Sequence, residues 1–284
     1  MNPRLLILLG AALFSTGGVA IKACTLTGWQ VAAFRSGLAA TALLVLLPAA
    51  RRGWNGRVWL VGLAYAGTLV LYALSNKMTT AANAIFLQAT SPLYVLVLSP
   101  LLLGESVRRH DIWFMVAAAF GIILFFVQVE APLATAPRPV LGNVLAVLSG
   151  ICYALTLLGI RWIARDTNPS DTTAMKAVIT GNLLACLICL PWALPVVSGL
   201  STNWLLIAYL GFFQIALAYL LVTAGMRRVT ATEAALLILV EPVLNPIWVW
   251  WFQHERPGPL ALLGGAVILG ACLLRIWQRW GVAP

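Results

Sequence analysis

Thr80-Ala-Ala-Asn-Ala-Ile-Phe-Leu-Gln-Ala-Thr-Ser-Pro92 has a counterpart 150 positions later, in Thr230-Ala-Thr-Glu-Ala-Ala-Leu-Leu-Ile-Leu-Val-Glu-Pro242. The match continues without a gap to Glu105 and Glu255, and six of the 26 aligned residues are identical. Apolar segments match one another easily. Proline and glutamate are uncommon in lipid-facing helices, however, so the matched proline and glutamate are the main evidence that the two stretches are related. The two stretches predict a pair of proline-broken helices that face each other inside a membrane.

The composition of the whole chain is that of a membrane protein. Of its 284 residues, 62% are hydrophobic and only 9% are charged, and the mean hydropathy is +0.95. Soluble proteins carry charge on about a quarter of their residues. The net charge of +10 would suggest nucleic acid in a soluble protein, whereas in a membrane protein it marks cytoplasmic loops. We therefore expect a lipid bilayer and a small-molecule substrate as partners, no nucleic acid, no cofactor, no metal, and a monomeric chain.

Cysteine gives no disulfide framework, because the five cysteines are scattered along the chain. Cys186 and Cys189 have the spacing of a redox pair, but they lie in an apolar run where a thiolate is strongly disfavoured. We interpret them as small packing residues.

Ten segments are long and apolar enough to cross a bilayer core, which takes roughly 20 residues of helix. They are Leu5–Ile21, Trp29–Leu47, Val58–Leu74, Ala81–Leu103, Ile112–Val129, Val140–Ile163, Ala174–Leu194, Trp204–Thr223, Ala231–Phe252 and Leu260–Ile276. Arg4 before the first run is also a feature of signal peptides. We expect an uncleaved span instead, because this helix has a counterpart in the second half.

The loops on the two sides of the membrane differ in basic residues. One side collects Arg4, Arg51, Arg52, Arg57, Arg108, Arg109, Arg161, Arg165, Arg227, Arg228, Arg275 and Arg279. The other collects only Lys22, Lys77, Arg138 and Arg256. Because cytoplasmic loops are enriched in Lys and Arg, both termini are predicted to be cytoplasmic.

The internal repeat extends over the whole chain. Ala12-Leu-Phe-Ser and Lys22 correspond to Ile151-Cys-Tyr-Ala and Arg161. The helices after the matched glutamates carry small-xxx-small pairs, Ala117/Gly121 and Ala266/Gly270, whose first role is helix packing. Residues 1–130 and 139–284 thus form two repeats of five spans. Because five is odd, the second repeat is inverted in the membrane, as in many secondary transporters. The predicted fold is an all-α integral membrane protein with ten transmembrane helices around a central cavity.

These features resemble the drug/metabolite transporter superfamily, in its ten-helix EamA-repeat branch. The resemblance rests on Ala33-Phe-Arg35, on Ser91-Pro92 with Gly104-Glu105, and on Glu241-Pro242 with Glu255. Within that branch, the chain resembles the bacterial aromatic amino acid exporters of the YddG type. The resemblance implies a cavity among the central helices, with helices 5 and 10 at the periphery, and export of metabolites. His254 departs from the repeat, because the first copy has Gly104 there.

The prolines and one glutamate mark the centre of the predicted bundle. Pro92 and Pro242 free the carbonyls four residues earlier, at Gln88 and Ile238. They are either simple kinks or cavity-lining breaks, and their symmetry favours a cavity. Glu241 near a helix midpoint is costly in lipid, so it is an ion, proton or amine site or a buried hydrogen-bonding group. Its counterpart in the first copy is Ser91.

Polar and aromatic side chains recur at helical spacing on several of the predicted helices, which indicates either interhelical hydrogen bonds or a weakly polar cavity. One face carries Tyr65, Thr68, Tyr72, Ser75 and Asn76, and another carries Ser149, Tyr153 and Thr156. The predicted substrate-binding residues are Tyr65, Tyr72, Gln88, Ser91, Tyr153, Gln214, Tyr219, Glu241 and Asn245, with helix breaks at Pro92 and Pro242.

Other charged residues fit less direct roles. Arg35 lies about seven residues into its helix, where we expect it to extend toward the headgroups rather than contact substrate. Glu105, Glu233 and Glu255 lie near helix ends and are predicted to make interfacial contacts or gate-like ion pairs.

A secondary transporter exporting small amphipathic metabolites by alternating access is the favoured function, with amino acids, including aromatic ones, as the expected cargo. No G-x-x-x-x-G-K-[ST] loop is present, so ATP is not the direct energy source. Export of drugs or organic cations is an alternative. An intramembrane enzyme or a channel is a second alternative, although the G-x-S-x-G and H-E-x-x-H motifs are absent and the protein is not expected to be an enzyme.

Overall fold

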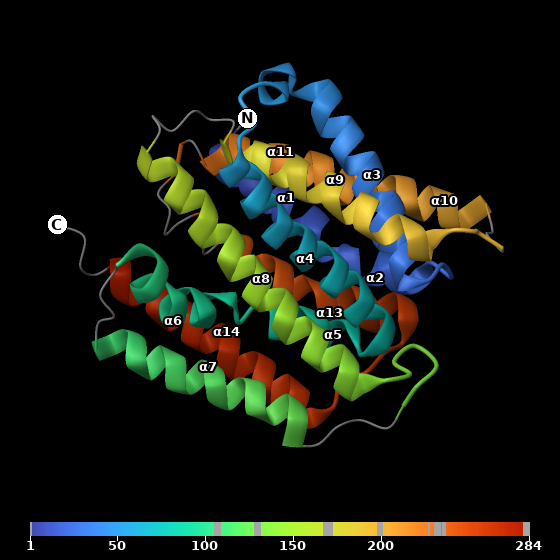
Figure 1. The fold of residues 1–284 in the computed structure, drawn as a ribbon. Coiled ribbons are helices and arrows are strands. Elements are labelled where there is room, and N and C mark those ends of the chain that lie inside the picture. The colour runs from blue at the N-terminus through green and yellow to red at the C-terminus, as the bar shows by residue number, and fades with distance from the viewer. Residues whose placement is uncertain are drawn as a thin grey trace.

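The apolar runs fold as helices because lipid offers no partner to backbone N–H and C=O groups, and a helix bonds them internally. The computed structural model describes residues 2–104, 109–127, 132–166, 173–197, 201–226, 228–229, 234 and 237–280. These residues form a bundle of helices, many of which run nearly parallel or antiparallel through the molecule (Figure 1). Large apolar side chains such as Leu101, Trp113 and Trp277 are exposed on its outside, as contact with lipid requires.

The helices of the first half are α1 (Pro3–Ser15), α2 (Gly17–Ala23), α3 (Gly28–Leu46), η1 (Pro48–Arg51), α4 (Gly56–Met78), α5 (Ala81–Gln88), α6 (Ser91–Leu103) and α7 (Arg109–Val127). Those described in the second half are α8 (Pro139–Asp166), α9 (Thr173–Ala193), α10 (Ser201–Ala208), η2 (Tyr209–Leu217), α11 (Ala218–Met226), α13 (Val240–Gln253) and α14 (Pro259–Trp280).

Eight helical stretches among the described residues are long and apolar enough to cross a membrane. They match eight of the ten predicted spans, and the shorter apolar stretch Asp111–Val127 matches a ninth. The remaining predicted span, Ala231–Phe252, contains α13, and its predicted beginning at Ala231 lies outside the described residues. The all-helical membrane fold is therefore confirmed, with eight or nine spans established directly.

The repeated stretch breaks at the same place in both copies. Helix α5 ends before Ala89, with φ −64° and ψ −7°, and α6 begins at Ser91. Helix α13 begins after Leu239, the aligned position, with φ −63° and ψ −10°. Pro92 and Pro242 both lie in the first turn of the helix that follows, where a missing backbone N–H costs nothing.

The far ends of these two helices also match. Gly104 ends α6 with φ 66° and ψ 23°, and His254 ends α13 with φ 54° and ψ 20°. Both residues are in the left-handed conformation that commonly terminates a helix. His254 therefore keeps the backbone symmetry that its sequence seemed to break, at the energetic cost that a side chain adds in this conformation.

The first predicted span is present as one apolar helical stretch, Pro3–Ala23, which is interrupted at a single residue. Helices α1 and α2 are separated at Thr16, whose hydroxyl donates to the carbonyl of Leu13 at 2.7 Å. Gly17 and Gly18 follow directly. The counterpart α8 runs unbroken from Pro139 to Asp166, so the two halves differ here.

Helices α7 and α14 pack against each other along one edge of the bundle (Figure 1), where helices 5 and 10 were expected. Their closest approach joins Gly121 to Gly264, because a methyl group on Gly264 would lie 2.8 Å from the Gly121 carbonyl oxygen. Gly270 has no atom within 4 Å of its added methyl group. The predicted packing role of Ala266/Gly270 is therefore wrong at Gly270, which is exposed.

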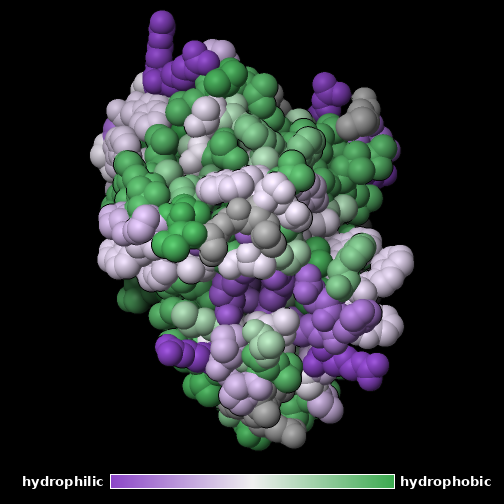
Figure 2. Space-filling view, turned by 90° about the vertical axis from the view of Figure 1, so that its right-hand side faces the viewer, coloured by the Kyte–Doolittle hydropathy of each residue, from purple (hydrophilic) through white to green (hydrophobic). Residues whose placement is uncertain are grey.

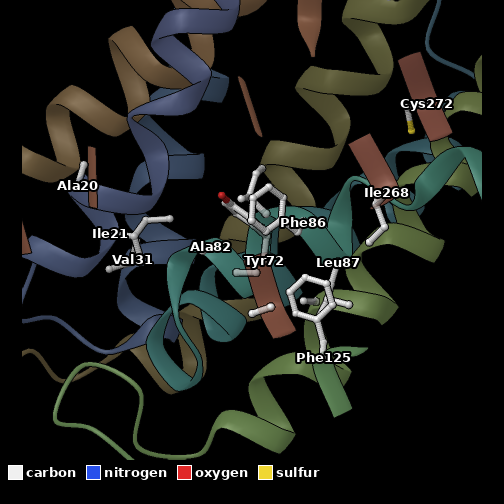
Figure 3. Close-up of a cluster of buried hydrophobic side chains, with 14 of the residues drawn as sticks. Ala20, Ile21, Val31, Tyr72, Ala82, Phe86, Leu87, Phe125, Ile268 and Cys272 are labelled. Carbon is white, nitrogen blue, oxygen red and sulfur yellow. The ribbon is translucent and has the colours of Figure 1, made fainter. Parts of the chain in front are cut away.

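A cluster of buried apolar side chains ties the two halves together around α5 (Figure 3). The rings of Phe86 and Phe125 lie 6.3 Å apart, and Ile268 on α14 belongs to the same cluster. A methyl group on Gly265 would lie 2.7 Å from the Phe86 ring, so α14 meets α5 through a residue without a side chain. This packing fixes the broken helix α5–α6 against the second half of the chain.

Candidate functional site

A cavity of about 500 Å³ lies between the helices at the level of the two breaks. Its walls come from α1, α3, α4, α5, α6, α7, α8, η2, α11, α13 and α14, which are elements of both halves. Ligand pockets in proteins typically have volumes of about 300–1,000 Å³. The cavity is therefore large enough for a metabolite of ordinary size.

Most of the predicted site residues line this cavity. They are Tyr65, Tyr72, Gln88, Ser91, Tyr153, Gln214, Tyr219 and Glu241, together with the helix-break residues Pro92 and Pro242. Asn245 does not line it. Although Asn245 is one turn beyond Glu241, a methyl group on Gly18 of α2 would lie 2.7 Å from its Oδ1 atom, so its side chain is packed against α2.

One wall of the cavity is aromatic. The ring of Tyr219 packs edge-on against Phe14 at 4.9 Å and against Tyr65 at 5.8 Å. Edge-to-face pairs of this kind stabilise by about 0.5–1.5 kcal/mol beyond the area that they bury. The three rings come from α1, α4 and α11, so they present one apolar surface built from both halves.

The break in α5–α6 supplies a polar part of the wall. The Gln88 amide donates to the Ser149 hydroxyl at 2.7 Å, and Ser149 donates to the Thr68 carbonyl at 3.0 Å. A methyl group on Gly150 would lie 3.2 Å from the Gln88 carbonyl oxygen, so α8 approaches the freed carbonyl closely. The break is thus packed by protein on one side and faces the cavity on the other, as expected for the cavity-lining alternative.

Arg35 is buried in the cavity wall, which overturns the expectation that it reaches the headgroups. Its side chain is 1% exposed, and its Nη2 atom donates to the Leu69 carbonyl at 3.0 Å. Its Nε atom is buried and forms no hydrogen bond with any described residue. The depth of Arg35 in its helix agrees with the prediction. However, α4 and α9 pack against α3, so the side chain does not reach the headgroups.

Glu241 faces the same cavity from the first turn of α13. A carboxylate at a helix N-terminus is favoured by the helix dipole. Among the described residues, no side chain forms an ion pair with it. Its counterpart Ser91 also lines the cavity, so the two aligned positions meet the same space from opposite halves.

The cavity reaches the surface at the end formed by Met226, Arg275 and Ile276. Arg275 Nε lies 3.2 Å from Asp111 Oδ1, and its guanidinium stacks on the Phe114 ring with 5.0 Å to the centroid. This pair links α14 to α7 beside the opening.

At the opposite end the halves are joined by a buried ion pair. Lys22 Nζ lies 3.0 Å from Glu255 Oε1, and both side chains are 2% exposed. Lys22 also donates to the carbonyls of Thr79 and Thr135. Glu255 accepts from the backbone N–H of Ala81 at 2.9 Å and from the Thr135 hydroxyl at 3.0 Å. None of these five residues lines the cavity.

Further hydrogen bonds between the halves surround this ion pair. The Asn203 side chain bonds Thr25 twice, at 2.9 Å to its N–H and at 2.8 Å to its hydroxyl. The Thr79 hydroxyl donates to Asn143 Oδ1 at 2.6 Å. Figure 2 views this end, and hydrophilic residues gather across the middle of the face between more apolar regions. Glu105 and Glu233, predicted with Glu255 to lie at helix ends, fall outside the described residues.

Phe14, Thr68 and Arg275 also line the cavity, although the sequence did not identify them as site residues. Gly17-Gly18 was a usable signal for the break in the first span. A methyl group on Gly17 would lie 2.8 Å from the Gln214 amide nitrogen, so the glycines admit cavity side chains against α2. Thr68 lies on the polar face of α4 that also carries Tyr65 and Tyr72, but only the two tyrosines were predicted to bind substrate.

Ser75, on that face, is fully buried, and no described residue forms a hydrogen bond with its hydroxyl. We expect Ser75→Ala to leave the melting temperature unchanged or raise it, because the variant removes a buried polar group that no residue satisfies. Ser15→Ala is the matched control. Ser15 is equally buried, but it accepts from Trp248 at 2.9 Å and donates to Ala12 at 2.7 Å. That variant should cost about 1–3 kcal/mol. Equal losses in thermal unfolding of the two purified variants would contradict the assignment.

The fold and the cavity define the class of protein. Two halves with corresponding broken helices enclose a space at the breaks, an arrangement that is found in transporters. A family model makes the class specific. The EamA-like transporter family matches residues 2–127 and 140–277, so the chain belongs to that family.

Individual relatives extend the comparison over nearly the whole chain. The pseudopaline exporter CntI of Pseudomonas aeruginosa is 25% identical over 277 residues, 95% of this chain and 94% of that protein. The aromatic amino acid exporter YddG of Ancylobacter novellus is 24% identical over 276 residues, 95% of this chain and 93% of that protein. A solved crystal structure superimposes with a TM-score of 0.64 at 20% identity, over 99% of both chains, and supports the fold. The resemblance inferred from the sequence is thus confirmed, and small-molecule export is supported.

Proposed function

We propose that this protein is an alternating-access exporter of small amphipathic metabolites, with amino acids, including aromatic ones, as its main substrates. The observation that carries the proposal is the cavity, which is walled by tyrosines from both halves and open at the Arg275 end, with the buried Lys22–Glu255 network at the other end of the bundle. An aromatic wall with few charges suits a solute that is apolar over most of its surface. Export agrees with the printed functions of two relatives.

The orientation follows from the basic residues. With both termini on the cytoplasmic side of a bacterial inner membrane, the open end of the cavity faces the cytoplasm. The second repeat then runs opposite to the first. The described conformation is inward-open, and the Lys22–Glu255 network is the closed outer side. Transport requires that this network separates while the halves close around Arg275 and Asp111.

Export of organic cations is the second candidate, because Glu241 adds an acidic group to an aromatic cavity. Aromatic faces and a carboxylate together bind cationic ligands well. The two candidates share a route through the protein and differ in cargo, so one assay distinguishes them.

Counterflow in proteoliposomes is the direct test. Vesicles containing the purified protein and a high internal concentration of unlabelled solute are diluted into a trace of the labelled form, with phenylalanine, tryptophan, leucine and a quaternary ammonium as the panel. We expect saturable, trans-stimulated uptake of the aromatic amino acids and little of the quaternary ammonium. Uptake of the cation alone would favour the second candidate. Absence of trans-stimulation for every amino acid would overturn the main proposal.

A further inference from the structure

We propose that the cavity selects amino-carboxylate zwitterions by two fixed charges, with Arg35 holding the carboxylate and Glu241 holding the ammonium group. The inference rests on the proposed function, because it concerns cargo within the same cavity. It goes further by assigning each end of the substrate to one residue.

Arg35 is a buried cation whose hydrogen-bonding capacity is largely unused. A guanidinium has five N–H donors, and the described residues accept only the bond from Nη2 to Leu69. The Nε donor is buried without a partner in a residue that is 1% exposed. Burying an unpaired charge is costly, and the fork of an arginine matches a carboxylate. The open donors therefore call for an anion that enters through the cavity.

Glu241 is the complementary group. It lines the cavity, and the ion pairs formed by described residues are made elsewhere, Lys22 with Glu255 and Arg275 with Asp111. No hydrogen bond from another described side chain satisfies its carboxyl group. An ammonium group entering the cavity would supply both charge and donors.

Arg35 and Glu241 line the same cavity, together with the rings of Tyr65 and Tyr72. Arg35 and Glu241 do not form an ion pair with each other. The cavity therefore offers a solute a cation, a separate carboxyl group and tyrosine rings. This arrangement favours a molecule that carries both charges and an apolar part.

The test measures how well four aromatic probes compete with labelled phenylalanine in counterflow. The zwitterions are phenylalanine and 4-amino-3-phenylbutyrate, which differ in the spacing of their charges. 3-Phenylpropionate lacks the ammonium group, and phenethylamine lacks the carboxylate. We expect at least one zwitterion to compete about tenfold to a hundredfold better than either singly charged probe, since a bond to a buried charge is worth that much.

Two variants test the two ends of the substrate separately. Arg35→Gln should abolish the discrimination against phenethylamine and keep that against 3-phenylpropionate, and Glu241→Gln should do the reverse. A role limited to packing would weaken all probes alike. Arg52→Gln removes an exposed arginine and is the matched control that should change neither preference.

The outcomes distinguish this inference from the proposed function. If no amino acid shows counterflow in the wild-type protein, both the proposed function and the two-charge site are wrong. If counterflow is robust and the singly charged probes compete as well as both zwitterions, only the two-charge site is wrong. Should Arg35→Gln fail to fold, the order in which the four probes raise the melting temperature of the wild-type protein decides the question.

Discussion

Glu255→Gln is expected to destabilise the protein by about 3–5 kcal/mol, because it leaves Lys22 buried without its anion. The glutamine retains an oxygen that can accept from the Ala81 N–H and the Thr135 hydroxyl, so the loss reports the missing charge rather than missing hydrogen bonds. Lys22→Met in the same background removes the stranded cation, and the double variant should recover most of the lost stability. Thermal unfolding of the four purified proteins completes the cycle.

The same substitution should open the side of the protein that the network holds shut. Cys24 lies two residues beyond Lys22, is 1% exposed, and accepts through its carbonyl from Lys77. With the other four cysteines replaced by alanine, we expect a membrane-impermeant maleimide added outside intact cells to label Cys24 faster in Glu255→Gln than in the parent. Arg138→Gln, an exposed charge at the same end, is the control and should leave labelling unchanged.

Two results would contradict this view of the network. If stability falls and Cys24 stays protected in every variant, the ion pair holds the fold together and does not gate the cavity. If Cys24 is labelled only after the reagent reaches the inside of the cell, the orientation of the chain is the reverse of the one proposed.

The parts of the structure that were predictable are those where the chain repeats or where lipid imposes a rule. Pro92 and Pro242 located both helix breaks, because a proline cannot continue the hydrogen bonding of the helix before it. Runs of about 20 apolar residues located the helices because lipid leaves the backbone no other partner. Tyrosines at helical spacing pointed into the cavity because a polar tip within a span needs a wet or bonded surface.

The unpredicted features depend on neighbours that are distant in the chain. Arg35 could be placed at a depth in its helix, but whether it reached the headgroups depended on α4 and α9 packing over it. Asn245 shared a helix face with Glu241, yet α2 lies close enough to take its side chain out of the cavity. An interfacial contact or gate-like ion pair was predicted for Glu255, but its partner Lys22 lies far away in the sequence and was not identified. Periodicity within one helix carries no information on which helix lies opposite.

The nine-residue π-helix η2 is the least predictable element. Its apolar sequence would fit an α-helix as well, and π segments are rare and often occur at functional sites. Gln214 and Ile215 in η2 line the cavity, and its Gly211 faces Arg35 and Leu38 of α3. The wider turn is thus placed where a second-half helix meets the arginine of the first half.

Gly211→Ala is expected to destabilise the protein by about 1–3 kcal/mol through overpacking. The added methyl group would lie 2.7 Å from Leu38 Cβ and 2.9 Å from the Arg35 carbonyl oxygen. Neither atom is the end of a flexible side chain, so η2 and α3 must separate. Because Gln214 and Arg35 sit on those two helices and face one cavity, we also expect the concentration of phenylalanine giving half-maximal counterflow to rise roughly tenfold, the effect of about 1.4 kcal/mol of lost binding.

Gly270→Ala provides the matched control for this close approach. It makes the same chemical change within α14, at an exposed position where the new methyl group has no atom within 4 Å. Alanine is favoured over glycine inside a helix by about 1 kcal/mol, so this variant should melt at the same temperature or higher and transport normally. If Gly211→Ala proved as stable and as active as Gly270→Ala, η2 would have room to move. The contact between η2 and α3 would then not set the geometry of the cavity.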